Sequence, residues 1–214
     1  MLVNAGFLST WRVIPPYLPP LSLRPKLALM IVCSLCCWAA AASGSYFVLL
    51  RNLEHPFFWG GAALGVQLIF GVVACWNNPP APKGSNAVSF TTLLLRGCLA
   101  AAAIIVSVIL AQLGSPLLAG IASVFPAIFL TTMVSVWLSQ GEAVQAGAVG
   151  PMMLGSGAVS AYALIAARSF EVCGPWLGAL LAWGGSVVLC SVPAALWMGL
   201  QHQKMAGMNE DKAL

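Results

Sequence analysis

Charged residues are scarce in this chain of 214 residues, since only 7% are Asp, Glu, Lys or Arg and 60% are apolar. A soluble domain carries about a quarter charged residues because its surface must face water. The scarcity of charge therefore argues against a soluble protein and predicts a surface that faces lipid. A net charge of +4, dispersed along the chain, is too small to indicate nucleic-acid binding.

Ionisable side chains are almost absent from the long apolar runs, where Arg96, near the start of one run, is the exception. Catalytic and proton-carrying sites inside membranes usually depend on such groups. The two histidines, His55 and His202, are expected on opposite sides of the membrane, which excludes a bis-histidine haem within one chain. Serine–histidine and aspartyl intramembrane proteases also lack their required residues here. We expect no enzymatic activity and no cofactor.

The seven cysteines lie mostly inside apolar runs, where a thiol behaves as a small hydrophobic group. An odd number without pairs in loops gives no disulfide framework. Cys33, Cys36 and Cys37, with Met30 one turn earlier, offer soft ligands of the kind that copper prefers. Without a second cysteine pair at matching spacing, packing is the favoured interpretation, and no metal site is predicted.

Six apolar runs are close to the length of about 20 residues that a helix needs to cross a bilayer. They cover 27–50, 57–75, 97–113, 116–138, 143–167 and 176–200. None of them shows the polar stripe of a soluble helix, and membrane-barrel strands would be half as long and alternating. The sequence predicts an all-α, polytopic membrane helix bundle. Gly114 and Ser115 leave room only for a tight turn between the third and fourth spans.

Residues 1–26 form a basic, proline-rich segment without acidic residues. Pro15-Pro16 and Pro19-Pro20 forbid a continuous helix and favour extended chain. A cleaved signal peptide is not expected, since no apolar segment with a cleavage site precedes Pro15. A plain cytosolic tail or a surface-lying segment is favoured over an organelle transit peptide. Residues 201–214 are predicted to form a polar C-terminal tail.

Lysine and arginine are distributed unevenly between the two sides that six spans define. Seven lie on the side of the termini: Arg12, Arg24, Lys26, Lys83, Arg96, Lys204 and Lys212. Only Arg51 and Arg168 lie on the other side. Basic residues accumulate on the cytosolic side of membrane proteins. Both termini are therefore predicted to be cytosolic, or on the matrix or stromal side of an organelle.

The fourth and fifth spans share a pattern of proline followed by hydroxyl residues. Shifted by 25 residues, Val, Pro, a hydroxyl residue, Val and Ser coincide around Pro126 and Pro151. Each proline removes a backbone hydrogen bond, and the freed carbonyl must be satisfied by neighbours, hydroxyls or water. The candidate solute pathway comprises Pro126, Thr131, Thr132, Ser135, Glu142, Pro151, Ser156 and Ser160. The alternative is that these residues assist helix packing, as small and hydroxyl residues do in membranes.

Glu142 lies in the short Ser139–Glu142 link before the fifth span. At the start of a helix its charge complements the positive end of the helix dipole, and this role is favoured over ion binding. Gln145 follows one turn later. Gln67 and Gln112 are expected to donate or accept hydrogen bonds between helices rather than to bind a ligand.

The stretch 119–162 contains the core Ser123-Val124-Phe125-Pro126-Ala127-Ile128-Phe129-Leu130. It resembles a family of small multi-span membrane proteins of uncharacterised function. The resemblance covers about a fifth of the chain and implies no catalytic residues. It supports the membrane interpretation alone.

Two functions fit this pattern. The leading hypothesis is a small carrier or permease for a neutral or weakly polar solute, which works by rearranging the helices of Pro126 and Pro151. The alternative is a non-catalytic structural subunit of a larger membrane complex, because six spans are few for a carrier unless it dimerises. The expected partners are the lipid bilayer and either a second copy or other membrane subunits.

Overall fold

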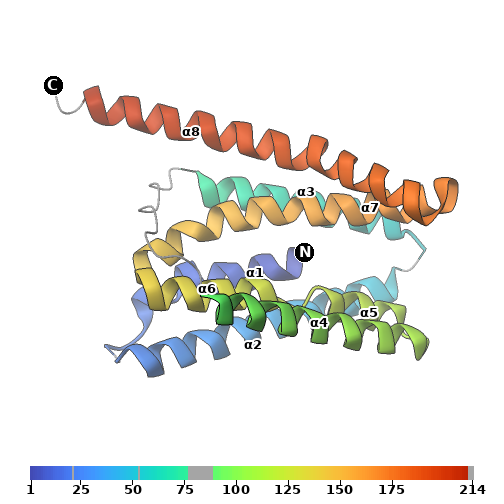
Figure 1. Ribbon diagram of the computed structural model, residues 1–214, viewed down its shortest axis with the longest axis horizontal. Coiled ribbons are helices and arrows are strands. Elements are labelled where there is room, and N and C mark those ends of the chain that lie inside the picture. Colours follow the sequence, from blue (N-terminus) through green and yellow to red (C-terminus); the bar gives the residue numbers. More distant parts are fainter. Residues whose placement is uncertain (21, 53, 77–88, 212–214) are drawn as a thin grey trace. The chain divides into compact units, whose positions relative to one another are not determined.

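The computed structural model describes residues 1–20, 22–52, 54–76 and 89–211. Its elements, labelled in Figure 1, are α1 (Leu2–Val13), a 3₁₀ turn (Pro15–Tyr17), α2 (Leu23–Arg51), α3 (Pro56–Cys75), α4 (Phe90–Gln112), α5 (Pro116–Ser123), α6 (Ala127–Gln140), α7 (Glu142–Ser186), a π-helical turn (Val187–Ser191) and α8 (Val192–Asp211). No strand occurs in these ranges. The predicted all-α fold is confirmed. Residues 77–88, between the second and third spans, lie outside the described residues, and so do Lys83 within them and Lys212.

Among the described residues, five helical stretches are long and apolar enough to cross a membrane. The last, Val144–Gln201, has 58 residues, or about 87 Å of helix at 1.5 Å per residue, far more than a bilayer needs. Gly174 interrupts it with φ 75° and ψ 174°, a conformation that favours glycine. Figure 1 shows the chain reversing its direction within α7. This stretch therefore supplies two spans, and the expected helix bundle has six.

The spans lie close to their predicted limits, with two differences. The third span begins at Phe90, so that Arg96 lies inside α4 rather than before it. The fourth span consists of two helices, α5 and α6, separated by three residues. The tight turn predicted between the third and fourth spans is present, since Gly114 has φ 76° and the N–H of Ser115 donates to O of Leu110 at 3.0 Å.

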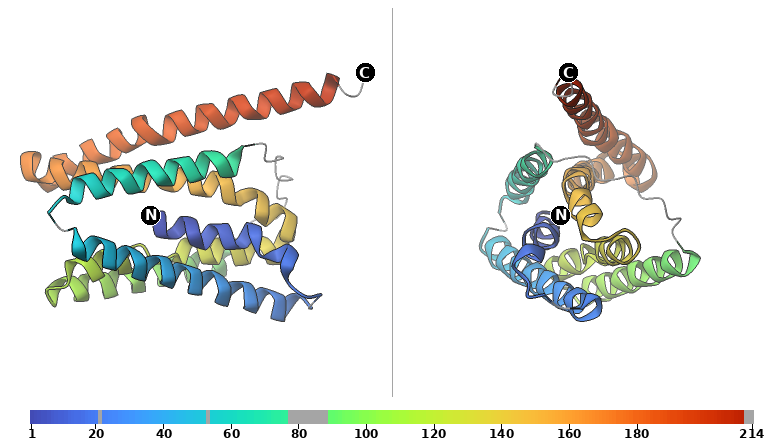
Figure 2. Two further views of the ribbon diagram at one scale, coloured as in Figure 1. Left: turned by 180° about the vertical axis from the view of Figure 1, so that it is seen from behind. Right: turned by 90° about the vertical axis from the view of Figure 1, so that its left-hand side faces the viewer.

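The first 13 residues differ from the extended tail that the sequence predicts. They form α1, a helix with apolar residues at spacings of three to five, and Phe7, Leu8 and Trp11 are completely buried. The prolines that follow do end this helix, as expected, at the turn Pro15–Tyr17. Both views of Figure 2 show α1 lying beside α2. An amphipathic helix packs here because its apolar face finds a partner in the neighbouring span.

The chain divides into two compact units, and each is described by itself. The first unit consists essentially of 57–80 and 150–214. In it α3 packs against α7, and Trp76, which follows α3, places its ring centroid 6.3 Å from that of Trp197 in α8. The second unit consists of 2–56 and 81–149. In it α1 and α5 contact α2, and α4 contacts α5 and α6.

Candidate functional site

The fourth span is broken close to its middle. Residues Val124, Phe125 and Pro126 are not helical, and they separate α5 from α6 inside a span of 25 residues. Pro126 is fully buried, and the N–H of Ala127 donates to O of Phe125 at 2.8 Å. Phe125 packs edge-to-face on Trp38 of α2, with centroids 5.3 Å apart. Irregular backbone at membrane depth is tolerated where protein or a wet cavity surrounds it, and here protein surrounds Pro126.

The fifth span is not broken at its proline, contrary to the sequence-based expectation. Pro151 lies inside α7, its side chain is exposed, and the only non-helical residue within α7 is Gly174. A proline removes one hydrogen bond and bends a helix, but neighbouring turns can keep the helix continuous in a membrane. The hypothesis of two matching broken helices is therefore wrong for the fifth span. Of the two proline-containing spans, only the fourth is interrupted at its proline.

The hydroxyl residues after Pro126 lie on two different faces of α6. Thr131 is buried, and its Oγ1 donates to O of Ala127 at 2.8 Å and contacts O of Ile128 at 3.2 Å. Thr132 and Ser135 are half-buried. They lie four and seven residues after the exposed Ile128, and so on the same side of α6 as that residue. Only Thr131 therefore belongs to the buried face.

A buried hydrogen-bond cluster links α3 to α7 in the first unit. Nε2 of Gln67 donates to O of Met153 at 3.0 Å and to Oγ of Ser156. Oγ of Ser156 also donates to O of Met153 at 2.7 Å. This confirms the interhelical role expected for Gln67, and it places Ser156 in a packing contact. Gln112 is exposed at the end of α4, and Ser160 is half-buried on α7.

Glu142 begins α7, as the sequence predicts, and it forms an ion pair that the sequence does not reveal. Nζ of Lys26, at the start of α2, donates to Oε2 of Glu142 at 2.6 Å. The ammonium lies 5.8 Å from the ring centroid of Trp137, within the range of a cation–π interaction. The side chains are 21% and 39% exposed. The pair thus joins the start of α2 to the start of α7 beside Trp137 of α6.

Gln145 and Trp11 are fully buried polar side chains near α6 that the sequence pattern did not mark as site residues. Nε2 of Gln145 donates to Sδ of Met133 at 3.0 Å, and the ring centroids of Trp11 and Trp137 are 5.7 Å apart. Met133 and Trp137 are four residues apart and share a face of α6. Within the described ranges, Oε1 of Gln145 and Nε1 of Trp11 have no hydrogen-bond partner. In this part of the chain, two polar atoms beside this face therefore lack a hydrogen-bond partner, an acceptor on α7 and a donor on α1.

The predicted pathway residues are divided between the two units. Pro126, Thr131, Thr132, Ser135 and Glu142 belong to the second unit, and Pro151, Ser156 and Ser160 belong to the first. Within the second unit, α6 connects the broken backbone at one end with the ion pair at the other. Convergence of the two sets on one pathway stays a prediction.

The cysteines of α2 differ in exposure, since Cys33 and Cys37 are half-buried and Cys36 is exposed. In the described part of the chain, no group of three or more His, Cys, Asp or Glu side chains is placed to hold a metal ion. Cys37 contributes to packing, because its Sγ lies 3.4 Å from the position of a Cβ on Gly6 of α1.

Comparisons with known proteins give no relative from which a role could be transferred. No protein-family model matches the sequence, no curated protein matches it, and no solved structure matches the fold. The resemblance of 119–162 to a family of small membrane proteins stays a prediction. The functional interpretation therefore rests on the residues themselves, in a chain whose apolar helices make it a multi-pass membrane protein.

Proposed function

We propose that this protein is a small carrier or permease for a neutral solute, and that the broken span α5–α6 is its moving part. The observation that supports this proposal is the irregular backbone around Pro126 near the middle of a membrane span. Straight scaffold helices have no need of such a break, whereas carriers use discontinuous helices at midplane binding sites.

The proposed pathway follows α6 from the membrane boundary to the midplane. At the boundary, the ion pair of Lys26 and Glu142 acts as a gate that Trp137 covers. Gln145 offers a carbonyl oxygen one turn of α7 further in. The 14 residues of α6 span about 21 Å, roughly half the thickness of a bilayer with its headgroups. A solute that passes the gate would thus reach the break.

The ion pair agrees with a topology of six spans, which places Lys26 and Glu142 on the same side of the membrane. Lys26 and Glu142, assigned to the cytosolic side from the distribution of basic residues, meet in the second unit. Trp76 follows the second predicted span and Trp197 lies near the end of the sixth, so the same topology places both on this side, and they meet in the first unit. The excess of basic residues is the argument that this side is the cytosolic one. We therefore keep both termini on the cytosolic, matrix or stromal side. A C-terminal tag cleaved by protease added outside intact cells would overturn this orientation.

Cysteine accessibility tests the pathway without knowledge of the solute. In a variant whose native cysteines are replaced by serine or alanine, Thr131→Cys is compared with Ile128→Cys. Thr131 is 8% exposed and Ile128 is 58% exposed on the outer face of α6. A charged, membrane-impermeant thiosulfonate should modify Thr131→Cys as the pathway opens, but not Ile128→Cys, which faces lipid. Ser139→Cys, exposed at the end of α6, serves as the positive control.

Equal, negligible modification of Thr131→Cys and Ile128→Cys in both vesicle orientations would contradict the pathway. If Thr131→Cys reacts, uptake of radiolabelled glycerol, urea and glycine into proteoliposomes identifies the solute class. Replacing Lys26 by Gln should then increase the rate of solute uptake, because it removes the ion pair that forms the gate.

One observation favours the alternative, a structural subunit of a membrane complex. Helix α4 has no buried residue along its 23 residues, and its surface is available to lipid or to another subunit. Gentle detergent extraction with native mass measurement separates these alternatives. A stoichiometric complex with other membrane proteins, together with an unreactive Thr131→Cys, would establish the subunit role.

A further inference from the structure

An apolar groove runs along the C-terminal half of α2, within the second unit. On α2 it is lined by small residues, Ala39, Ala42 and Ser43, and by aromatic residues that include Trp38 and Phe47. Its volume is about 330 Å³, which lies at the lower end of the range for small-molecule sites.

Helix α5 supplies the opposite wall of this groove. Leu118 and Ile121, one turn apart, face the α2 residues across it. The groove is broadly open at its surface, and its position along two membrane spans opens it to the acyl chains of the bilayer. An occupant must therefore be long, apolar and available from the membrane.

The length and depth of the groove match one leaflet. Trp38 lies at the middle of the apolar stretch of α2, and Phe47 lies nine residues further along. Nine residues of helix rise about 14 Å, and half of a bilayer's hydrocarbon core is about 15 Å thick. The groove therefore extends from the midplane to the boundary of the leaflet opposite the predicted cytosolic side.

A cation continues the line of the groove into the headgroup region. Arg51 follows Phe47 by four residues and so lies one turn beyond it on the same side of α2. Arg51 is the last residue of this helix, its side chain is exposed, and in the described ranges it forms no ion pair. It stands about 20 Å along the helix from Trp38, which is the depth of lipid phosphates.

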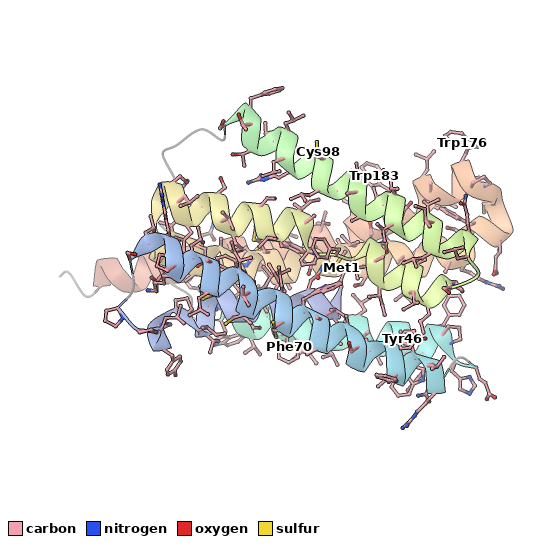
Figure 3. All side chains as sticks on the ribbon, turned by 90° about the horizontal axis from the view of Figure 1, so that it is seen from below. Met1, Tyr46, Phe70, Cys98, Trp176 and Trp183 are labelled. Atoms are coloured by element: carbon pink, nitrogen blue, oxygen red, sulfur yellow. The ribbon has the colours of Figure 1, made fainter. Side chains whose placement is uncertain are left out.

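We propose that this groove is a binding site for one phospholipid of the outer leaflet, whose acyl chain lies along α2 and whose phosphate pairs with Arg51. The groove supplies van der Waals contacts along one chain, and the guanidinium matches a phosphate in charge and geometry. Polar atoms line the groove as well. Ser43 brings a hydroxyl group to its middle, and Tyr46, labelled on α2 in Figure 3, brings one closer to the boundary, where the ester linkages of a lipid lie.

Photo-crosslinking of the full-length protein in nanodiscs tests this site. The probe is phosphatidylglycerol with a diazirine on one acyl chain, and the labelled residues are mapped by mass spectrometry. We expect labelling of 38–47 and of Leu118 or Ile121 to exceed that of α4. Helix α4 has no buried residue and therefore reports ordinary contact with surrounding lipid.

Three variants separate a specific site from general lipid contact. Ser43→Phe fills the groove and should reduce its labelling to the level of α4. Gly44→Phe is the matched control, since a Cβ on Gly44 meets nothing within 4 Å and this residue does not line the groove. Arg51→Gln should weaken competition by unlabelled phosphatidylglycerol about fivefold, the effect of one cation near a membrane surface.

The outcome that overturns the proposal is plain. If α4 and the groove are labelled equally in the unmodified protein, or if Ser43→Phe and Gly44→Phe behave alike, the groove holds only exchanging bulk lipid. If diacylglycerol with the same chains competes as well as phosphatidylglycerol, Arg51 does not recognise a phosphate. The labelling of α4 in each variant confirms that the protein remains folded and inserted.

Discussion

Gly71 is the position where the packing of α3 on α7 allows the least change. A Cβ placed on Gly71 would lie 2.7 Å from Cα and 2.9 Å from N of Leu154, both of which are backbone atoms. Carbon atoms in contact need about 3.5–4.0 Å. Gly71→Ala must therefore push the two helices apart by about 1 Å, because the backbone of α7 cannot turn aside as a side chain would.

This displacement has a calculable effect on stability. It moves Nε2 of Gln67, now 3.0 Å from O of Met153, beyond hydrogen-bond reach. Overpacking contributes about 1–3 kcal/mol, and an interhelical hydrogen bond in a membrane contributes about 0.6 kcal/mol and at most about 1.7. We expect Gly71→Ala to lower the free energy of unfolding by about 2–4 kcal/mol, which changes the folding equilibrium about 30-fold or more.

The assay is equilibrium unfolding in mixed micelles by dodecyl sulfate, followed by circular dichroism. Gly65→Ala is the matched control on the same helix, since its Cβ meets nothing within 4 Å and alanine is a better helix former by about 1 kcal/mol. Gly150→Ala should repeat the loss from the other helix, because its Cβ would lie 2.8 Å from O of Ala74. Equal stability of Gly71→Ala and Gly65→Ala would refute the reasoning.

Three further changes test other contacts. Gln67→Leu keeps the side-chain volume but removes the hydrogen bonds to α7, so it should lower the free energy of unfolding by about 1 kcal/mol in the same titration. A loss above about 3 kcal/mol would mean that the amide does more than join two helices. Pro126→Ala should slow hydrogen exchange of the backbone amides around the break. Pro151→Ala lies inside a continuous helix and should leave the exchange of the amides around Pro151 unchanged. Similar effects of both changes would contradict the assignment of a single broken span. Lys26→Glu and Glu142→Lys should each lower the free energy of unfolding by about 0.5–1 kcal/mol, and the double reversal should restore it. Strictly additive losses in the double variant would show that the pair does not interact.

The membrane fold was predictable from the sequence because its signals are local. Length, hydropathy and the absence of charge define the spans within a few residues, and the turn at Gly114 follows from the lack of room between two spans. The role of Gln67 was also predictable, since a buried amide in a membrane helix needs a partner. Its partner, O of Met153, is 86 positions away and could not be named from composition.

The features that escaped prediction depend on contacts between distant segments. Pro126 and Pro151 have similar local sequences, but only Pro126 is enclosed by packing, with Phe125 held against Trp38. The similar sequences around the two prolines therefore predicted two broken helices, whereas only the helix at Pro126 is broken. The pairing of Lys26 with Glu142 joins residues 116 apart, and charge counting places them on one side of the membrane without bringing them together.

Helix α1 was missed because the prolines after it dominated the interpretation of the first 26 residues. A signal was present, since Val3, Phe7 and Trp11 repeat every four residues, as the apolar face of a helix does. Twelve residues are too few to cross a bilayer, so a search for spans passes over this helix.

The burial of α1 has a consequence for the time course of synthesis. Trp11 contacts Trp137, which leaves the ribosome 126 residues later. At about 5–20 residues per second, the interval is roughly 6–25 s. During this time α1 has α2 as a neighbour but lacks α6, and its remaining apolar surface must rest in the membrane interface. Slower elongation prolongs this state, so the yield of assembled protein should depend on translation speed between the second and fourth spans.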